Sequence, residues 1–205
     1  ISRTNIDNAE YTTFGSKMIW SSTFSGGIFG GNENYHKHVL NFKWYTPILS
    51  KVVLYQNLAF GAIKPLVENE YLSYRTRFSM GGSGVPTGEM LRGYPDNSIG
   101  PSISYYSRGG NIMFKYSLEL RFLLSPSPTI YLLLFADTGR IWSDFEDIDI
   151  FNLKRSAGIG IRLNMPMLGV IGYDYGYGFD HWNDDENIKR PFGWEHHFIF
   201  GVPLN

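Results

Sequence analysis

Three charged side chains near the middle of the chain have the types and the surroundings for a buried ion pair. Arg92 stands among turn-forming residues in "MLRGYPDNSIGP", residues 90–101. Glu119 in "YSLELRF" and Asp137 in "LFADTGRIW" are flanked by apolar residues. A carboxylate in such surroundings is costly unless it is paired, and a guanidinium group can hold it with two parallel hydrogen bonds. We expect Arg92 to pair with Glu119 or Asp137, a contact that orders structure and breaks no covalent bond.

The sequence lacks the common motifs of catalytic, metal-binding and phosphate-binding sites. Without cysteine, the chain can form no disulfide, thiolate metal site or cysteine nucleophile. There is no G-x-S-x-G, no H-E-x-x-H and no glycine-rich phosphate loop after a strand. The formal net charge of -1 gives no electrostatic footprint for nucleic acid. We therefore expect no enzyme, no cofactor and no nucleic-acid partner.

The segments that must position the charged residues alternate apolar and polar residues. In residues 113–122, aromatic and aliphatic residues occupy every second position, and Lys115, Ser117, Glu119 and Arg121 lie between them. Residues 155–165, 170–178 and 194–202 repeat the pattern. Weaker candidates are residues 16–25, 36–46 and 52–63, and residues 129–137 are apolar on both faces. This pattern predicts about eight β-strands, several with the 9–11 residues of a tilted membrane strand.

The composition of the two faces favours an all-β, antiparallel transmembrane β-barrel. One face is rich in Phe, Tyr, Leu, Ile and Trp, whereas the other is mostly Gly, Ser and charged residues, poor material for a soluble exterior. The longest apolar run, residues 130–136, is too short for a membrane helix. Short connections also alternate with long ones, as in outer-membrane barrels. A soluble β-sandwich or lipocalin-like barrel is the alternative, because alternation does not say which face is inside.

The segment around Arg92 belongs to a long connection, residues 64–111. A loop of this length inside a compact domain is usually functional or disordered. The turn formers of "RGYPDN" favour a fixed conformation. The alternatives are an exposed loop cation at Arg92 without a fixed partner, and ordinary wet-pore polarity at Glu119 and Asp137.

Several motifs resemble the Omp85 superfamily. "LRGYPDNSIGP" resembles its loop-six signature, [V/I/L]-R-G-[F/Y], and the continuation "NSIGP" resembles the assembly factors within that superfamily. "LFADTGRIW" resembles the family's F-x-D-x-G-x-[V/I]-W motif, and "RSAGIGIRLNMPMLGVIGYDYG" its penultimate strand pair. "AEYTTFGSKM" resembles the F-P-T-x-G motif, with Thr12 in place of proline. The resemblance covers residues 6–202.

The resemblance implies a role for individual residues. Arg92, Gly93 and Tyr94 match the tip of a loop that folds into the barrel lumen and docks on the wall. Asp137 and Gly139 match the wall motif, and Glu119 matches the acidic residue of the preceding strand. At the other end of the chain, the alternating Phe198, Phe200 and Val202 resemble an outer-membrane β-signal on the last strand. In the family, that strand forms a weak seam with the first strand of the barrel.

The resemblance also implies the extent of the domain. We expect residues 1–205 to form one barrel domain, equivalent to the C-terminal half of a sixteen-stranded barrel, with the periplasmic transport-associated domains absent. The alternative is a small closed barrel in which residues 16–25 pair with residues 194–202. Such closure would displace the loop at residues 64–111.

The function implied is that of an outer-membrane protein assembly factor, an insertase that opens its seam laterally and templates incoming strands. The alternatives are a related polypeptide secretion transporter and a soluble ligand-binding barrel. Expected partners are outer-membrane lipid and lipopolysaccharide, nascent outer-membrane barrel proteins, and accessory periplasmic lipoproteins bound through the missing N-terminal domains. The expected location is the outer membrane of a Gram-negative-type bacterium. We interpret His36, His38, His196 and His197 as polar residues at the membrane interface and expect no metal site.

Overall fold

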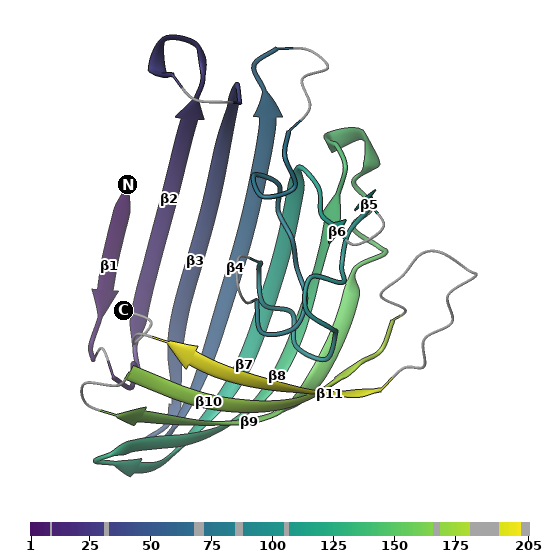
Figure 1. Ribbon diagram of the computed structural model, residues 1–205. Coiled ribbons are helices and arrows are strands. Elements are labelled where there is room, and N and C mark those ends of the chain that lie inside the picture. The colour runs from purple at the N-terminus through teal and green to yellow at the C-terminus, as the bar shows by residue number, and fades with distance from the viewer. Residues whose placement is uncertain are drawn as a thin grey trace.

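The main element of the fold is a curved antiparallel sheet of nine strands that follow one another in chain order (Figure 1). The computed structural model describes residues 1–8, 10–30, 33–67, 72–84, 88–104, 107–165, 169–180 and 193–201. The strands of the main sheet are β1 (Ser2–Ile6), β2 (Gly15–Ser25), β3 (Tyr35–Leu49), β4 (Val52–Pro65), β7 (Ile112–Pro126), β8 (Thr129–Trp142), β9 (Lys154–Met165), β10 (Gly169–Gly178) and β11 (Trp194–Gly201). Two short strands, β5 (Ser102–Ser104) and β6 (Ser107–Arg108), pair separately within the long connection.

All eight predicted strands are present, and the structure adds β1, which pairs with β2. Its sequence, "SRTNI", has no apolar alternation, which is why the pattern did not predict a strand there. The two helical elements, η1 (Gly27–Phe29) and η2 (Phe145–Asp147), are 3-10 turns of three residues each. Among the described residues, no helix has the length and apolar character needed to cross a membrane.

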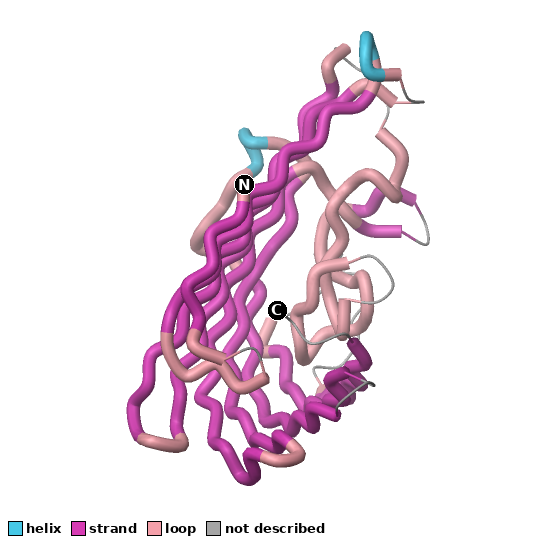
Figure 2. Tube along the Cα trace, turned by 90° about the vertical axis from the view of Figure 1, so that its left-hand side faces the viewer, coloured by secondary structure: helices cyan, strands magenta, loops and turns pink. Residues whose placement is uncertain are grey.

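The sheet is open, with β1 at one edge and β11 at the other. The small closed barrel is therefore not formed, because β2 pairs with β1 and β3 rather than with β11. Because the sheet is open, its concave side has room for the β4–β7 loop (residues 66–111). The described part of that loop lies on the concave side and is not displaced (Figure 2).

The apolar side chains of the alternating strands β9 and β11 point away from the concave side, as predicted. Ile161 and Phe198 are 41% and 62% exposed, whereas Glu119 and Arg162 are each 6% exposed. Because successive residues of a strand point to opposite faces, one orientation fixes all positions of a strand. A sheet with its polar residues inside and its large apolar residues outside is the arrangement of a membrane-spanning barrel wall.

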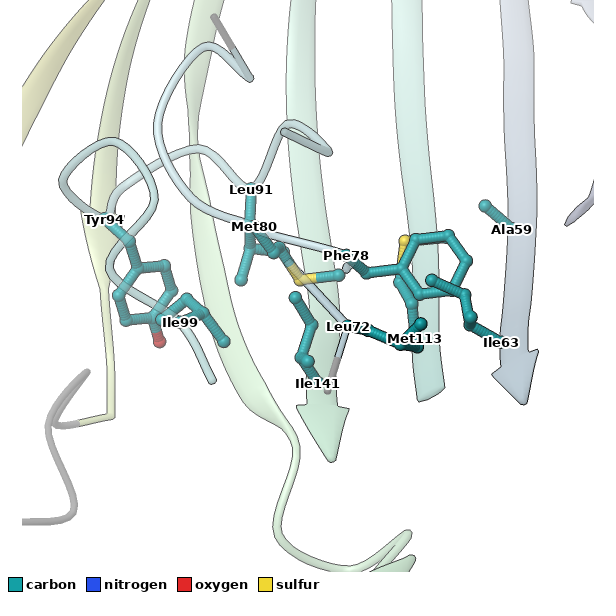
Figure 3. Close-up of a cluster of buried hydrophobic side chains, with 10 residues drawn as sticks. All are labelled: Ala59, Ile63, Leu72, Phe78, Met80, Leu91, Tyr94, Ile99, Met113 and Ile141. Atoms are coloured by element: carbon teal, nitrogen blue, oxygen red, sulfur yellow. The ribbon is translucent and has the colours of Figure 1, made fainter. Parts of the chain in front are cut away.

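The β4–β7 loop carries a hydrophobic cluster of its own onto the wall (Figure 3). The loop contributes Leu72, Phe78, Met80, Leu91, Tyr94 and Ile99, and the strands contribute Ala59, Ile63, Met113 and Ile141. The inner face is thus apolar near the start of β7 and polar further along it. Burying a Leu, Ile, Met or Phe side chain stabilises by about 1.5–3 kcal/mol. Burial of these side chains therefore stabilises the docked loop, and polar contacts determine where its tip lies.

Candidate functional site: the loop tip on the inner wall

Arg92 is buried against the wall and pairs with Asp137 through two parallel hydrogen bonds along one edge of its guanidinium group. Nε lies 2.7 Å from one carboxylate oxygen and Nη2 lies 2.8 Å from the other. Nη1 lies 2.8 Å from Oε1 of Glu119, but outside hydrogen-bonding geometry, so that contact is an ion pair. The structure thus brings Arg92 to both of the carboxylates considered from the sequence.

A third carboxylate and an aromatic ring complete the surroundings of Arg92. Asp174 on β10 lies 3.6 Å from Nη1. The guanidinium carbon lies 3.8 Å from the centre of the Phe135 ring, a distance at which the cation is attracted to the ring face. Arg92 therefore contacts β7 through Glu119, β8 through Asp137 and β10 through Asp174, so one side chain bridges neighbouring and separated strands of the wall.

Two of the three carboxylates, Glu119 and Asp174, each pair with a further guanidinium group. Arg121 lies 2.7 Å from Glu119, and Arg162 makes two hydrogen bonds to Asp174, of 2.6 and 2.7 Å. Three guanidinium groups thus face three carboxylates, and their formal charges cancel. Such neutrality is what allows so many ionised groups to be buried together.

The charge of Arg92 is fixed by its partners. Burial alone lowers the pKa of an arginine, but Asp137 and Glu119 outweigh burial and hold the pKa of Arg92 well above its ordinary value. The guanidinium group therefore stays protonated at any pH at which the protein is folded. The loop contact consequently depends on the carboxylates, not on titration of the arginine.

Gly93 allows the loop tip to approach the wall backbone. Its φ is +82°, in the left-handed region that disfavours residues with a Cβ. A Cβ at this position would also lie 2.8 Å from the carbonyl carbon of Tyr177. Bore-facing glycines on β10 complete the fit, since a Cβ on Gly178 would lie 2.5 Å from the Gly93 carbonyl oxygen. The two backbones can touch here because the residues at the contact, Gly93 and Gly178, have no side chains.

Tyr94 fixes the loop tip to the far ends of β9 and β10. Its hydroxyl donates to the backbone carbonyl of Arg155 at 2.6 Å and accepts from the backbone N–H of Asp180 at 3.3 Å. The ring is buried in the loop cluster, and burial raises the pKa of the Tyr94 phenol. The phenol thus remains a hydrogen-bond donor.

His197 corrects one interpretation from the sequence. It does not lie at the membrane interface: it is 5% exposed, faces the bore, and its Nε2 accepts a 2.9 Å hydrogen bond from the Gly93 N–H. His36 and His38 do share a face, with ring nitrogens 3.1 Å apart. Among the described residues, no group of three or more His, Asp or Glu is arranged to hold a metal ion.

The remaining predicted residues lie apart from the ion pairs. Gly139 on β8 makes room for the loop, since a Cβ there would lie 2.9 Å from Sδ of Met80. Phe198 and Phe200 point outward from β11, 62% and 73% exposed. Val202 lies outside the described residues.

Five residues described above as part of the site were not predicted as site residues: Arg121, Phe135, Arg162, Asp174 and His197. Alternation placed Arg162 and Asp174 on the polar face, and their pairing follows from the register in which Gly172 lies opposite Arg162. A strand pairing derived from the sequence would have brought them together. No sequence pattern indicated that the loop tip reaches the last strand.

Comparisons with known proteins agree with this geometry. The Omp85 superfamily domain matches residues 1–202. A curated relative, the outer membrane protein assembly factor BamA of Nitratidesulfovibrio vulgaris, is 28% identical over 196 residues, covering 93% of this chain and 24% of the relative. Among solved structures, that of BamA from Haemophilus ducreyi lacking POTRA domains 1-3 superposes with a TM-score of 0.72 at 22% identity, covering 88% of this chain and 38% of that one.

The chain therefore spans about a quarter of the curated relative and less than half of the solved structure. The match to the family domain covers nearly the whole chain, which confirms the resemblance drawn from the motifs. The similar solved structure supports the barrel fold. The chain belongs to the Omp85 superfamily, and its strands form the wall of an integral outer-membrane β-barrel protein of Gram-negative bacteria.

Proposed function

We propose that this chain is part of the barrel of an outer-membrane protein assembly factor that inserts nascent barrel proteins into the membrane. The observation that carries the proposal is the docking of Arg92 on Asp137 and Glu119, which fixes the β4–β7 loop inside the bore. The relative named as an assembly factor supports the same function.

The last strand is the part of the wall suited to accept an incoming strand. Within the described residues, β11 pairs with β10 alone, so the groups on its other edge have no partner in the sheet. Such an edge is a template for strand addition. In the whole barrel we propose that β11 forms a weak seam with the first strand and that this seam opens towards lipid. Its outward Phe198 and Phe200 then contact lipid at the opening.

The docked loop has a defined part in this mechanism. Because the loop packs on the inner wall through its hydrophobic cluster, it stiffens the strands from β4 to β10, which lie next to the seam strand. We propose that a rigid wall and a mobile seam strand together allow opening at one place only. The proposed clients are nascent outer-membrane barrels, and the surrounding lipid includes lipopolysaccharide.

The test uses the full-length protein in its own cells. Depletion is expected to lower the amounts of many folded outer-membrane barrels, and re-expression of the wild type restores them. Arg92→Ala is expected to restore them poorly. Ile28→Ala, at a 95% exposed position in η1, is the matched control and restores them fully. Loss of a single secreted protein, with other barrels unchanged, would instead identify a secretion transporter.

A further inference from the structure

We propose that His197 is a positioning residue that connects the loop tip to the last strand, so that loop docking and the pairing of β11 with β10 stabilise each other. The consequence for assembly rests on the proposed function, whereas the physical coupling does not. The inference starts from one contact, the 2.9 Å hydrogen bond from the Gly93 N–H to Nε2 of His197.

This contact extends the reach of the loop tip by one strand. The Arg92 side chain contacts β7, β8 and β10, through Glu119, Asp137 and Asp174. The next residue, Gly93, contacts β11 through His197. Two consecutive loop residues therefore connect the wall to the strand at its edge, and any displacement of β11 is felt at the loop tip.

Both partners of the contact are buried, which makes its loss unfavourable. His197 is directly opposite Asp174 in the β10–β11 register, and Asp174 is fully buried in its ion pairs with Arg162 and Arg92. When β11 leaves β10, the Gly93 N–H loses its acceptor while the wall still encloses it. A buried N–H without a partner is costly, so the docked loop favours the paired strand.

The chemistry restricts which side chains can replace histidine. The contact needs a hydrogen-bond acceptor that reaches the bore from β11, which the unprotonated Nε2 of a neutral imidazole provides. Glutamine offers an amide oxygen at the end of a side chain of similar length. Leucine has a similar volume but no acceptor. His197→Gln and His197→Leu are therefore a matched pair that separates hydrogen bonding from packing.

Coupling between the two places is reciprocal by thermodynamic necessity. If His197 helps to hold the loop, the docked loop equally helps to hold β11. Releasing the loop at another anchor, with the sequence of β11 unchanged, must therefore loosen β11. Arg92→Ala is such a release, because the ion pairs of Arg92 in the described part of the chain are with carboxylates of β7, β8 and β10.

The test is hydrogen exchange of the β11 amides (residues 194–201), followed by mass spectrometry on the full-length protein in lipid nanodiscs. Arg92→Ala is expected to raise their exchange at least five-fold, and His197→Leu to raise it similarly. The double variant is expected to exchange no faster than His197→Leu, and His197→Gln to stay within two-fold of the wild type. Gel migration of unboiled samples establishes that each barrel is folded.

Two results would overturn the inference. One is β11 exchange in Arg92→Ala that equals that of the wild type. This result would overturn the inference even if His197→Leu did not fold. The other is multiplication of the two single effects in the double variant. Because exchange requires no client protein, the result is independent of assembly activity. Coupled exchange in a protein whose depletion leaves outer-membrane barrels intact would refute the proposed function and leave this inference standing.

Discussion

Asp137 accepts two hydrogen bonds from the Arg92 side chain, of 2.7 and 2.8 Å, and a longer one of 3.4 Å from the Arg92 backbone N–H, although the two residues are 45 positions apart in the sequence. The carboxylate and the guanidinium group lie edge to edge, which only arginine among the cationic side chains permits. Phe135, two residues before Asp137 on the same inner face, covers the guanidinium plane. The wall thus offers Arg92 both a charge and a flat apolar surface.

Arg92→Lys is expected to behave almost like Arg92→Ala. An ammonium group keeps the charge but loses the two-pronged contact with Asp137 and the stacking on Phe135. In Arg92→Ala, which removes the cation and leaves its carboxylates buried, the cost is about 3–5 kcal/mol. The measurement is protection of the β4–β7 loop from protease in the full-length folded protein. Protection at the wild-type level in Arg92→Lys would contradict the account.

Gly93→Ala is expected to displace the loop tip. The substitution introduces strain at a φ of +82° and a Cβ only 2.8 Å from the backbone of Tyr177. Gly27→Ala is the matched control, since Gly27 also has a positive φ, +55°, but nothing lies within 4 Å of its added Cβ. Strain alone costs on the order of 1–3 kcal/mol. Equal losses of thermal stability in the two variants would show that the loop tip does not touch the wall.

Met80→Ala is expected to weaken loop docking by about 2–5 kcal/mol, the usual range for emptying a buried Met position. Met80 is fully buried in the loop cluster, and its sulfur lies 2.9 Å from where a Cβ on Gly139 would be. Hydrogen exchange at residues 88–104 is expected to rise, while exchange of the strand amides away from the loop cluster is unchanged. Leu134→Ala, at a position 50% exposed on the outer face, is the control. A loop that stays protected in Met80→Ala would refute the claim that apolar packing of this side chain holds the loop on the wall.

Acid is expected to loosen the end of β10. Burial by itself raises the pKa of Asp180, but hydrogen bonds from Arg155 outweigh burial and hold that pKa below its ordinary value. A lowered pKa stabilises the fold above the unfolded value of about 3.9, and the contribution is lost as pH falls through the folded value. The Arg155 side chain is 67% exposed, so solvent screens the pair and the effect is small.

The check compares the wild type with Asp180→Asn in thermal unfolding. The wild type is expected to be slightly more stable at pH 7, and the difference is expected to shrink once pH falls below about 3.9 and to disappear below the folded pKa of Asp180. A difference that grows on acidification would mean that the carboxylate is destabilising in the folded protein.

The strands and their orientation were predictable because successive residues of a strand in a barrel wall face lipid and the bore in turn, so apolar and polar residues alternate. Lys115 and Glu119 lie on the inner face, as their alternation with apolar residues required. Arg92 and Asp137 were also predictable as partners, since an isolated cation and a carboxylate in apolar surroundings each need an opposite charge. The polar strand β1 has no such pattern and was missed.

The apolar packing of the loop was not predictable from the sequence. Leu72, Met80 and Leu91 are separated by irregular spacings, so they follow neither the period of a strand nor that of a helix. The contact of Gly93 with His197 joins residues 104 positions apart, and one partner is a backbone N–H that no residue type signals. Such contacts depend on the path of the loop, which is set by the folded wall.

The most direct test of the account is a double-mutant cycle between Arg92 and Asp137 in the full-length protein. The loop-docking free energy is measured by hydrogen exchange at residues 88–104 in the wild type, Arg92→Ala, Asp137→Ala and the double variant. A direct pair predicts non-additive losses, with an interaction energy of about 2–3 kcal/mol. Additive losses, with no interaction energy beyond error, would contradict the claim that this pair fixes the loop on the wall.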